Sequence, residues 1–187
     1  MRLPVFAART SLALLVLAPL IALAGGVTVP PYTRSMVPNG TVLLVMPRKD
    51  VPLIAFTALL RGGSVADPQS KPGLASITAG LLEKGAGARD AFAFADAVEG
   101  AGGSFTAAAG TEAITVSGQF LAKDQELMIG LLADALERPR FDAAEFDSLR
   151  KRRIEELKAA KDSDPSGLIR LYGRRFLFGD HPYGSPS

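Results

Sequence analysis

The sequence predicts an α+β domain. Strand-like and helix-like segments follow one another in the order β-β-α-α-β-β-α-α-α, so helices are grouped between pairs of strands and do not follow each strand singly. Of the 187 residues, 48% are hydrophobic and 21% are charged, which is enough apolar material for one globular domain with a core of its own. This composition argues against intrinsic disorder.

Residues 1–24 have the organisation of a secretory signal peptide. Arg2 and Arg9 flank the start of an apolar run, Leu12 to Leu23, which ends in a small-residue cleavage motif, Ala22-Leu23-Ala24. Because a membrane-spanning helix needs ~20 apolar residues, we expect cleavage and export to the periplasm or the medium, with no stable membrane anchor afterwards. The alternative is a retained N-terminal anchor. A Pro-containing lead segment, 25–38, comes next.

The mature chain is predicted to be neutral. Two of the 21 Lys and Arg residues, Arg2 and Arg9, belong to the signal segment, which leaves 19 basic residues against 19 acidic ones. A neutral surface lacks the basic patch that nucleic-acid binding requires, so that class of function is excluded. The chain has no cysteine, and therefore no disulfide framework is expected.

Two apolar runs predict the first pair of strands. The turn residues Asn39-Gly40 precede the run 41–46, and a second run, 53–60, ends at Arg61-Gly62-Gly63. Because both runs are nearly continuous in apolar residues, we expect these strands to be covered on both faces.

The first pair of helices follows. Leucine and isoleucine recur at helical spacing from Leu74 to Leu82, and Gly85 is placed to end that helix. Asp90 is the expected N-cap of the second helix, which carries Phe92 and Val98 and stops at Gly100.

The second pair of strands is predicted at 104–109 and 114–120, the latter because apolar and polar residues alternate. Three helices complete the pattern. The first stops before Pro139, the second begins with the capping-box residues Asp142 to Glu145, and the third has Asp164 as N-cap and Pro165 at its first position.

Six short motifs follow one another along the chain: Asn39-Gly40, Arg61-Gly-Gly-Ser64, Gly73-Leu-Ala75, Gly102-Gly-Ser104, Arg138-Pro-Arg-Phe141 and Asp180-His-Pro-Tyr-Gly184. In this order and spacing they resemble the N-terminal domain of the insulinase or pitrilysin family, the M16 metallopeptidases, which includes mitochondrial processing peptidase. The resemblance covers 39–187. It implies an M16 peptidase-like (LuxS/MPP-like) domain, in which a mixed, mainly antiparallel sheet packs against several helices. It also implies that the chain is a fragment that lacks a second domain.

The zinc-binding positions of this family are vacated. The signature His-x-x-Glu-His places two zinc ligands and a general base on one helix, and its positions fall on Ser76, Ala79 and Gly80. The chain has a single histidine, His181, so two histidine ligands are impossible. The resemblance places Lys151 at the third ligand position, where its positive charge would repel a cation. We therefore expect no catalytic residue, no metal and no cofactor, with zinc bound by a partner or by active relatives.

Peptide binding does not require those residues. In the family, the edge strand that corresponds to 104–108 pairs with the backbone of an extended substrate. The resemblance thus assigns peptide binding to Ser104, Phe105, Thr106, Ala107 and Ala108, because main-chain pairing needs no catalytic group. The alternative is an ordinary strand of the sheet.

We expect an exported, non-catalytic M16 homologue that binds extended peptides, acts as the partner subunit of an active M16 zinc peptidase in a heterodimer, or does both. Two alternatives remain open. One is an active zinc metalloendopeptidase with an atypical site, and the other is a structural interaction protein of the periplasm.

Overall fold

The computed structural model describes residues 29–163 and 165–184, and it divides into two compact units, Met1–Arg48 and Lys49–Ser187. The predicted signal peptide and the predicted cap Asp164 lie outside the described residues. In the described part of the chain, no helix combines the length and the apolar content that crossing a bilayer requires.

The described residues of the first unit form a β-hairpin. Strand β1 (Thr33–Met36) pairs antiparallel with β2 (Val42–Val45), and the turn is closed by the Asn39 side chain, whose Oδ1 accepts a hydrogen bond from the Thr41 amide at 3.0 Å. β2 confirms the predicted strand, whereas β1 was not predicted, because it is short, polar and close to prolines. Both strands are exposed along their whole length, so the expectation that β2 is covered on two faces is wrong.

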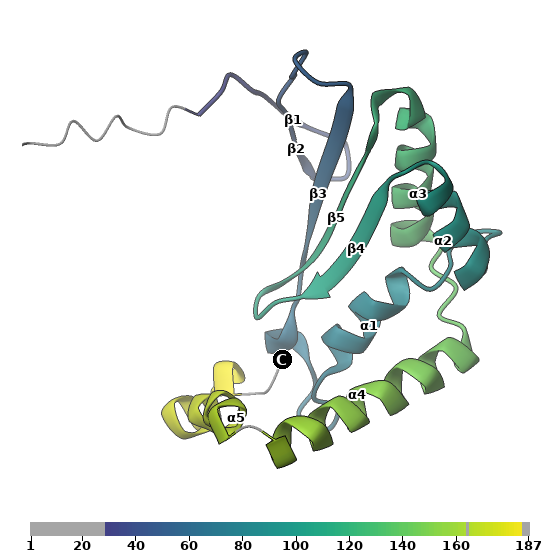
Figure 1. Cartoon of the computed structure of the whole chain (residues 1–187). Coiled ribbons are helices and arrows are strands. Elements are labelled where there is room, and N and C mark those ends of the chain that lie inside the picture. The colour runs from purple at the N-terminus through teal and green to yellow at the C-terminus, as the bar shows by residue number, and fades with distance from the viewer. Residues whose placement is uncertain (1–28, 164, 185–187) are drawn as a thin grey trace, which may run out of the picture. The chain divides into compact units, whose positions relative to one another are not determined.

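The second unit contains a three-stranded antiparallel sheet in the order β3-β5-β4 (Figure 1). Its strands are β3 (Leu53–Arg61), β4 (Ser104–Ala109) and β5 (Ala113–Leu121). Along β3, exposed residues alternate with partly buried ones, and Leu59 is 71% exposed, so burial of this strand on both faces was also a wrong expectation. The alternation follows from the architecture, because helices cover only one face of the sheet (Figure 1).

Three helices cover that face: α1 (Leu74–Leu82), α2 (Ala91–Gly100) and α3 (Gln125–Glu137). The core between them and the sheet contains Phe94, Phe105, Val116, Phe120 and Leu131. The rings of Phe94 and Phe105 meet edge to face with centroids 5.1 Å apart, a favourable geometry for aromatic pairs.

Most of the local signals that define helix ends are confirmed. The Asp90 side chain accepts a hydrogen bond from the Ala93 amide at 2.8 Å and caps α2. The core residues of that helix are Phe94 and Val98, whereas Phe92 is 80% exposed. As predicted, α3 ends before Pro139.

The last two helices are α4 (Ala143–Ser163) and α5 (Pro165–Phe178), and Pro165 takes the first position of α5 as predicted. The Asp142 carboxylate accepts a hydrogen bond from the Ala144 amide at 2.9 Å at the start of α4. α4 packs against α1 (Figure 1), whereas Ile169, Tyr172 and Phe176 of α5 are exposed, Phe176 at 89%.

Three short 3-10 helices link these elements: η1 (Ser64–Ala66), η2 (Ala122–Asp124) and η3 (Pro182–Gly184).

Candidate functional site

The helix that carries the three signature positions is held at its N-terminus by a side chain from the preceding loop. Asp67 follows η1, and its two carboxylate oxygens accept hydrogen bonds from the amides of Gly73 and Ala75, each at 2.8 Å. Gly73 is left-handed, with φ 86°, which glycine adopts without strain. The Asp67 carboxylate thus satisfies two amides that would otherwise lack partners in the first turn of α1 and complements the positive end of the helix dipole.

The signature positions themselves form one small-residue face of α1. Ser76 is partly buried, Ala79 is 1% exposed, and Gly80 lies one turn after Ser76. A Cβ atom on Gly80 would lie 2.8 Å from Cδ2 of Leu149 in α4, which is closer than real Cβ atoms come to their neighbours. Gly80 therefore allows α4 to approach α1, and Leu149 fills the volume that a side chain at position 80 would need.

The chemistry of this face is that of a hydroxyl, a methyl and a hydrogen atom. None of the three groups is a good zinc donor, and none can take a proton from water as a general base. Leu149, which is 5% exposed, contributes only an apolar side chain to this face.

On α4, the charged residues near the predicted third-ligand position lie on the surface. Lys151 is exposed, and it is Leu149 that contacts Gly80. The carboxylate of Glu155 pairs with Lys158 at 2.9 Å, and that of Glu156 pairs with Arg153 at 2.9 Å. These are exposed pairs between residues of the same helix. Among the described residues, no group of three His, Asp or Glu side chains is placed to hold a metal ion.

The predicted peptide-binding strand is an edge strand in the described part of the sheet. β4 pairs with β5 on one side, with Thr106 opposite Ser117 and Ala107 opposite Val116. Phe105 is buried in the core, whereas Ser104, Thr106 and Ala108 are exposed on the face without helices. On the free side of β4, the amide of Ala107 donates a hydrogen bond to Oε1 of Glu83 at 2.5 Å.

Comparison with known proteins identifies the family. The sequence profile of Insulinase (Peptidase family M16) matches residues 55–173, which is more than half of the chain. This chain belongs to peptidase family M16. Uncharacterized zinc proteases of Mycobacterium leprae and Mycobacterium tuberculosis (strain ATCC 25618 / H37Rv) are each 31% identical to it over 124 residues, or 66% of this chain. The match spans only 28% of the length of each relative.

Two solved structures share the fold. The peptidase M16 inactive domain from Pseudomonas fluorescens superposes with a TM-score of 0.78 at 24% identity, covering 83% of this chain and 38% of the other. A protease from Helicobacter pylori superposes with a TM-score of 0.74 at 21% identity, covering 84% and 38%. The resemblance to M16 peptidases and the predicted α+β architecture are therefore confirmed.

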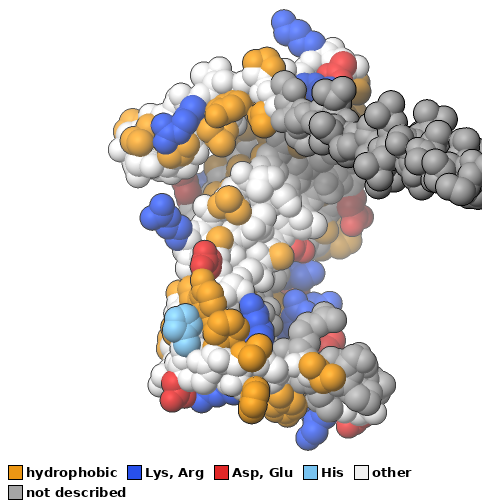
Figure 2. Space-filling view, turned by 90° about the vertical axis from the view of Figure 1, so that its left-hand side faces the viewer, with side chains coloured by type: hydrophobic (Ala, Val, Ile, Leu, Met, Phe, Trp, Pro, Cys, Tyr) orange, Lys and Arg blue, Asp and Glu red, His pale blue; other side chains and the backbone are white. Residues whose placement is uncertain are grey.

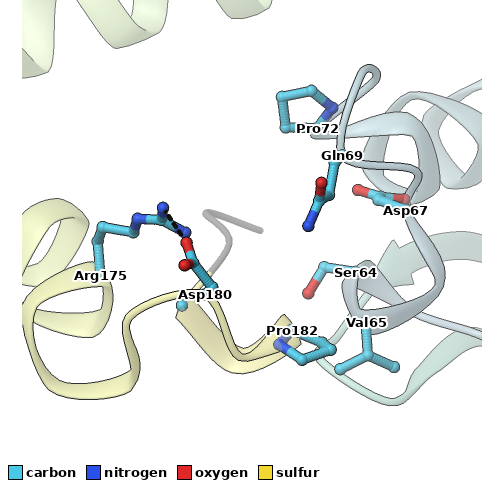
Figure 3. A pocket seen from close by; sticks show the side chains of 9 residues that line it. Ser64, Val65, Asp67, Gln69, Pro72, Arg175, Asp180 and Pro182 are labelled. Atoms are coloured by element: carbon cyan, nitrogen blue, oxygen red, sulfur yellow. Dashed lines mark hydrogen bonds and ion pairs between the residues drawn. The ribbon is translucent and has the colours of Figure 1, made fainter.

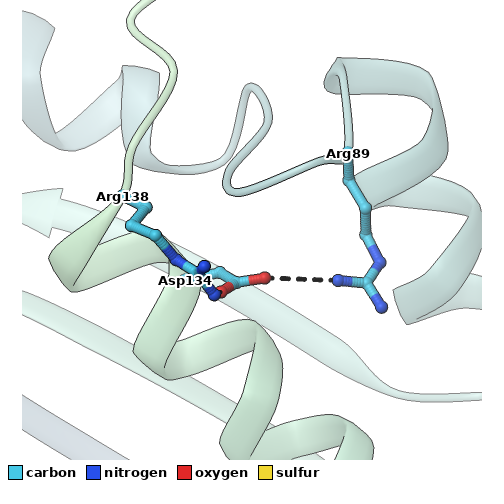
Figure 4. Close-up of polar contacts among 3 residues, drawn as sticks. All are labelled: Arg89, Asp134 and Arg138. Atoms are coloured by element: carbon cyan, nitrogen blue, oxygen red, sulfur yellow. Dashed lines mark hydrogen bonds and ion pairs between the residues drawn. The ribbon is translucent and has the colours of Figure 1, made fainter.

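In this M16 domain, the turn after Glu83 is anchored by a buried carboxylate that sequence reasoning did not single out. Asp134 of α3 pairs with Arg89 at 3.3 Å and also contacts Arg138 (Figure 4). Between them, Gly87 donates its amide to the Arg138 carbonyl at 2.9 Å. A Cβ atom on Gly87 would lie 2.6 Å from Oδ2 of Asp134, so the turn passes directly over the carboxylate. These contacts fix the chain that leads away from Glu83.

A second feature of the M16 domain that the sequence did not predict is a pocket of about 400 Å³ beside η1, η3 and α5. Figure 3 shows Arg175 and Asp180 on one side, joined by an ion pair of 2.6 Å, and Ser64 and Gln69 on the other. The buried hydroxyl of Ser64 has no hydrogen-bond partner among the described residues. The pocket lies at the Asp180-His-Pro-Tyr-Gly184 motif, and its lining includes Asp67 but none of Ser76, Ala79 and Gly80.

The single histidine, His181, belongs to that motif and is exposed. In the space-filling view, the one side chain in the histidine colour lies at the lower left beside a group of hydrophobic side chains (Figure 2). Its Nδ1 accepts a hydrogen bond from the Tyr183 amide at 3.2 Å, and the two rings meet edge to face. The Tyr183 hydroxyl donates a hydrogen bond to the Glu112 carboxylate on the β4–β5 turn, and this bond and the negative charge of Glu112 raise the pKa of Tyr183.

Proposed function

We propose that this M16 domain is a non-catalytic, exported peptidase homologue that binds extended peptides along β4 and supports an active M16 zinc peptidase as its partner subunit. The observation that carries the proposal is the packing of Leu149 against Gly80. A histidine at that position would provide one of the zinc ligands of the His-x-x-Glu-His signature, and in this chain the same volume holds an apolar side chain.

Two further observations support the loss of catalysis. Ala79 replaces the general base with a buried methyl group, and Ser76 leaves a hydroxyl where a ligand nitrogen is required. A structural neighbour from Pseudomonas fluorescens is described as an inactive M16 domain. Zinc would then be bound by the partner, not by this chain.

Peptide binding is supported by the free edge of β4. An extended peptide that adds to an edge strand gains main-chain hydrogen bonds without any catalytic group. The exposed side chains of Ser104, Thr106 and Ala108 are small, so they add little bulk beside a second strand, which has to displace only the Glu83 carboxylate from the Ala107 amide.

Binding is tested with the purified chain and fluorescent ten-residue peptides that have high β-propensity, measured by fluorescence polarisation. The proposal predicts saturable binding, no cleavage on prolonged incubation, and loss of binding when alternate peptide amides are N-methylated, because methylation blocks strand addition. Equal binding of the methylated peptides would contradict strand addition.

The partnership is tested by co-purification with an M16 protein of the same organism that retains His-x-x-Glu-His. The proposal predicts a stable complex in which zinc and peptide hydrolysis depend on the partner's signature residues. Hydrolysis by this chain alone that a chelator abolishes and zinc restores would favour the alternative of an active zinc metalloendopeptidase. The mycobacterial relatives are named zinc proteases.

A further inference from the structure

Glu83 is placed where helix electrostatics disfavour it. It is the C-cap residue of α1, and a carboxylate at this end meets the negative pole of the helix dipole. Its side chain is partly buried, and it makes no ion pair with another described residue. The neighbouring Lys84 lines a separate hollow together with Asp90 and Arg140. The carboxylate therefore has a role other than stabilising its own helix.

The contact of Glu83 lies on the free edge of β4. The Ala107 amide points away from β5 and donates to Oε1 of Glu83 at 2.5 Å. Main-chain amides alternate in direction along an antiparallel strand, so those of Phe105 and Ala109 share the free side with Ala107. Glu83 thus occupies the middle one of three consecutive outward amides, and in this state it protects the edge against pairing with another chain.

The same carboxylate is placed to contact the side chain of an added strand. Residues directly opposite one another on paired strands direct their side chains to the same face of the sheet. The side chain of Ala107 packs against the core that includes Ala79 and Leu82 of α1, so the residue of a peptide opposite Ala107 would direct its side chain to the helix-covered face. Glu83 approaches β4 from α1 on this face.

We propose, on the basis of the proposed peptide binding along β4, that Glu83 determines specificity for peptides with a basic side chain opposite Ala107. An incoming strand takes over the Ala107 amide and displaces the carboxylate from a charge-assisted hydrogen bond. A lysine or arginine on the peptide compensates the displaced carboxylate by forming an ion pair. An acidic residue at the same place meets a like charge and is excluded.

The test uses three ten-residue peptides that differ only at every second position, which is lysine, glutamine or glutamate. All registers related by two residues therefore place the same kind of side chain opposite Ala107. Opposite charges across a strand pair attract and like charges repel by similar small amounts, so wild-type protein is expected to bind the lysine peptide about tenfold more tightly than the glutamate peptide. The Glu83→Gln variant retains an oxygen that can accept the Ala107 amide, and it is expected to bind both peptides with affinities within about twofold.

The control variant is Glu99→Gln, which removes the same charge from an exposed position on α2 and should retain the preference for lysine. A lysine preference that persists in Glu83→Gln, or is lost in Glu99→Gln as well, would overturn the assignment to Glu83 and leave peptide binding intact. If wild-type protein bound all three peptides saturably and with equal affinity, the assignment to Glu83 would also be overturned. Absence of saturable binding for all three peptides would refute the proposed function and this inference together.

Discussion

The packing of Leu149 against Gly80 predicts that the two residues are energetically coupled. The perturbation is Gly80→Ala, which adds one methyl group on the face of α1 that meets α4. Its Cβ atom would lie 2.8 Å from Leu149 Cδ2, 3.5 Å from Cδ1 and 3.7 Å from Cγ. Because Leu149 is buried, its side chain has little room to move away.

Two opposing terms determine the change in the free energy of unfolding. Alanine is preferred over glycine in a helix interior by about 1 kcal/mol. Overpacking a well-packed contact costs about 1–3 kcal/mol. We therefore expect Gly80→Ala to destabilise wild-type protein by about 1 kcal/mol, the difference between these terms.

In the Leu149→Ala background, the clash is removed and the helix preference remains. Leu149→Ala alone should cost about 2–5 kcal/mol, because it truncates a buried leucine. Gly80→Ala should then stabilise the truncated protein by up to about 1 kcal/mol. A change in the sign of the effect of Gly80→Ala between the two backgrounds would show that residue 80 contacts Leu149.

The assay is urea unfolding followed by circular dichroism on the four proteins of the double-mutant cycle. The matched control is Gly130→Ala in α3, where an added Cβ would meet nothing within 4 Å, so it should stabilise both backgrounds equally. If Gly80→Ala stabilised the wild type as much as the Leu149→Ala protein, the packing would be refuted.

Three further predictions concern the anchors of the fold. Asp67→Ala should lower the free energy of unfolding by about 0.5–2 kcal/mol in urea titrations, because two amides at the start of α1 lose their acceptor, and Asp67→Asn should recover part of the loss. Asp134→Ala should lower the free energy of unfolding by about 1–2 kcal/mol, which is less than the usual cost of breaking a buried ion pair because the two arginines that it releases can reach solvent. It should also increase amide hydrogen exchange in the turn 85–89, and unchanged exchange there would contradict the anchoring role. Because the pKa of Tyr183 is raised in the folded protein, its contribution to stability is present below the ordinary tyrosine pKa and is lost as pH rises through the folded value. Tyr183→Phe should reduce the alkaline loss of stability, and an unchanged pH profile would argue against the Glu112 contact.

The elements with strong local signals could be predicted from the sequence. Asp90 and Asp142 are capping residues whose side chains reach amides two or three residues away, so the chemistry that defines the helix start is visible in a short window. The alternation in β5 likewise places Ile114, Val116 and Phe120 in the core, as observed. Strand β1 has no such signal, because Thr33-Arg-Ser-Met36 is short, mostly polar and fully exposed.

Burial was harder to predict than strand position. The apolar run of β3 suggested two covered faces, but an antiparallel sheet with helices on one side leaves Leu53 and Leu59 exposed. The sequence contains no information on how many layers cover a strand, since that depends on segments distant along the chain.

The candidate site could be predicted in part. The vacated positions Ser76, Ala79 and Gly80 followed from the resemblance to M16 peptidases. The side chains that complete the site, Leu149 and Glu83, did not, because each makes its defining contact with a residue far away in the sequence. Lys151, which was placed at the third ligand position, is exposed, and that register stays a prediction.

The most direct test of a non-catalytic M16 domain is the zinc content of the purified chain, measured by elemental analysis after incubation with excess zinc and gel filtration. Glycine, alanine and serine provide neither of the two histidine nitrogens that the signature uses, so we predict far less than one equivalent of zinc per chain and no peptide hydrolysis. One tightly bound equivalent, lost together with hydrolytic activity on chelation, would contradict the account.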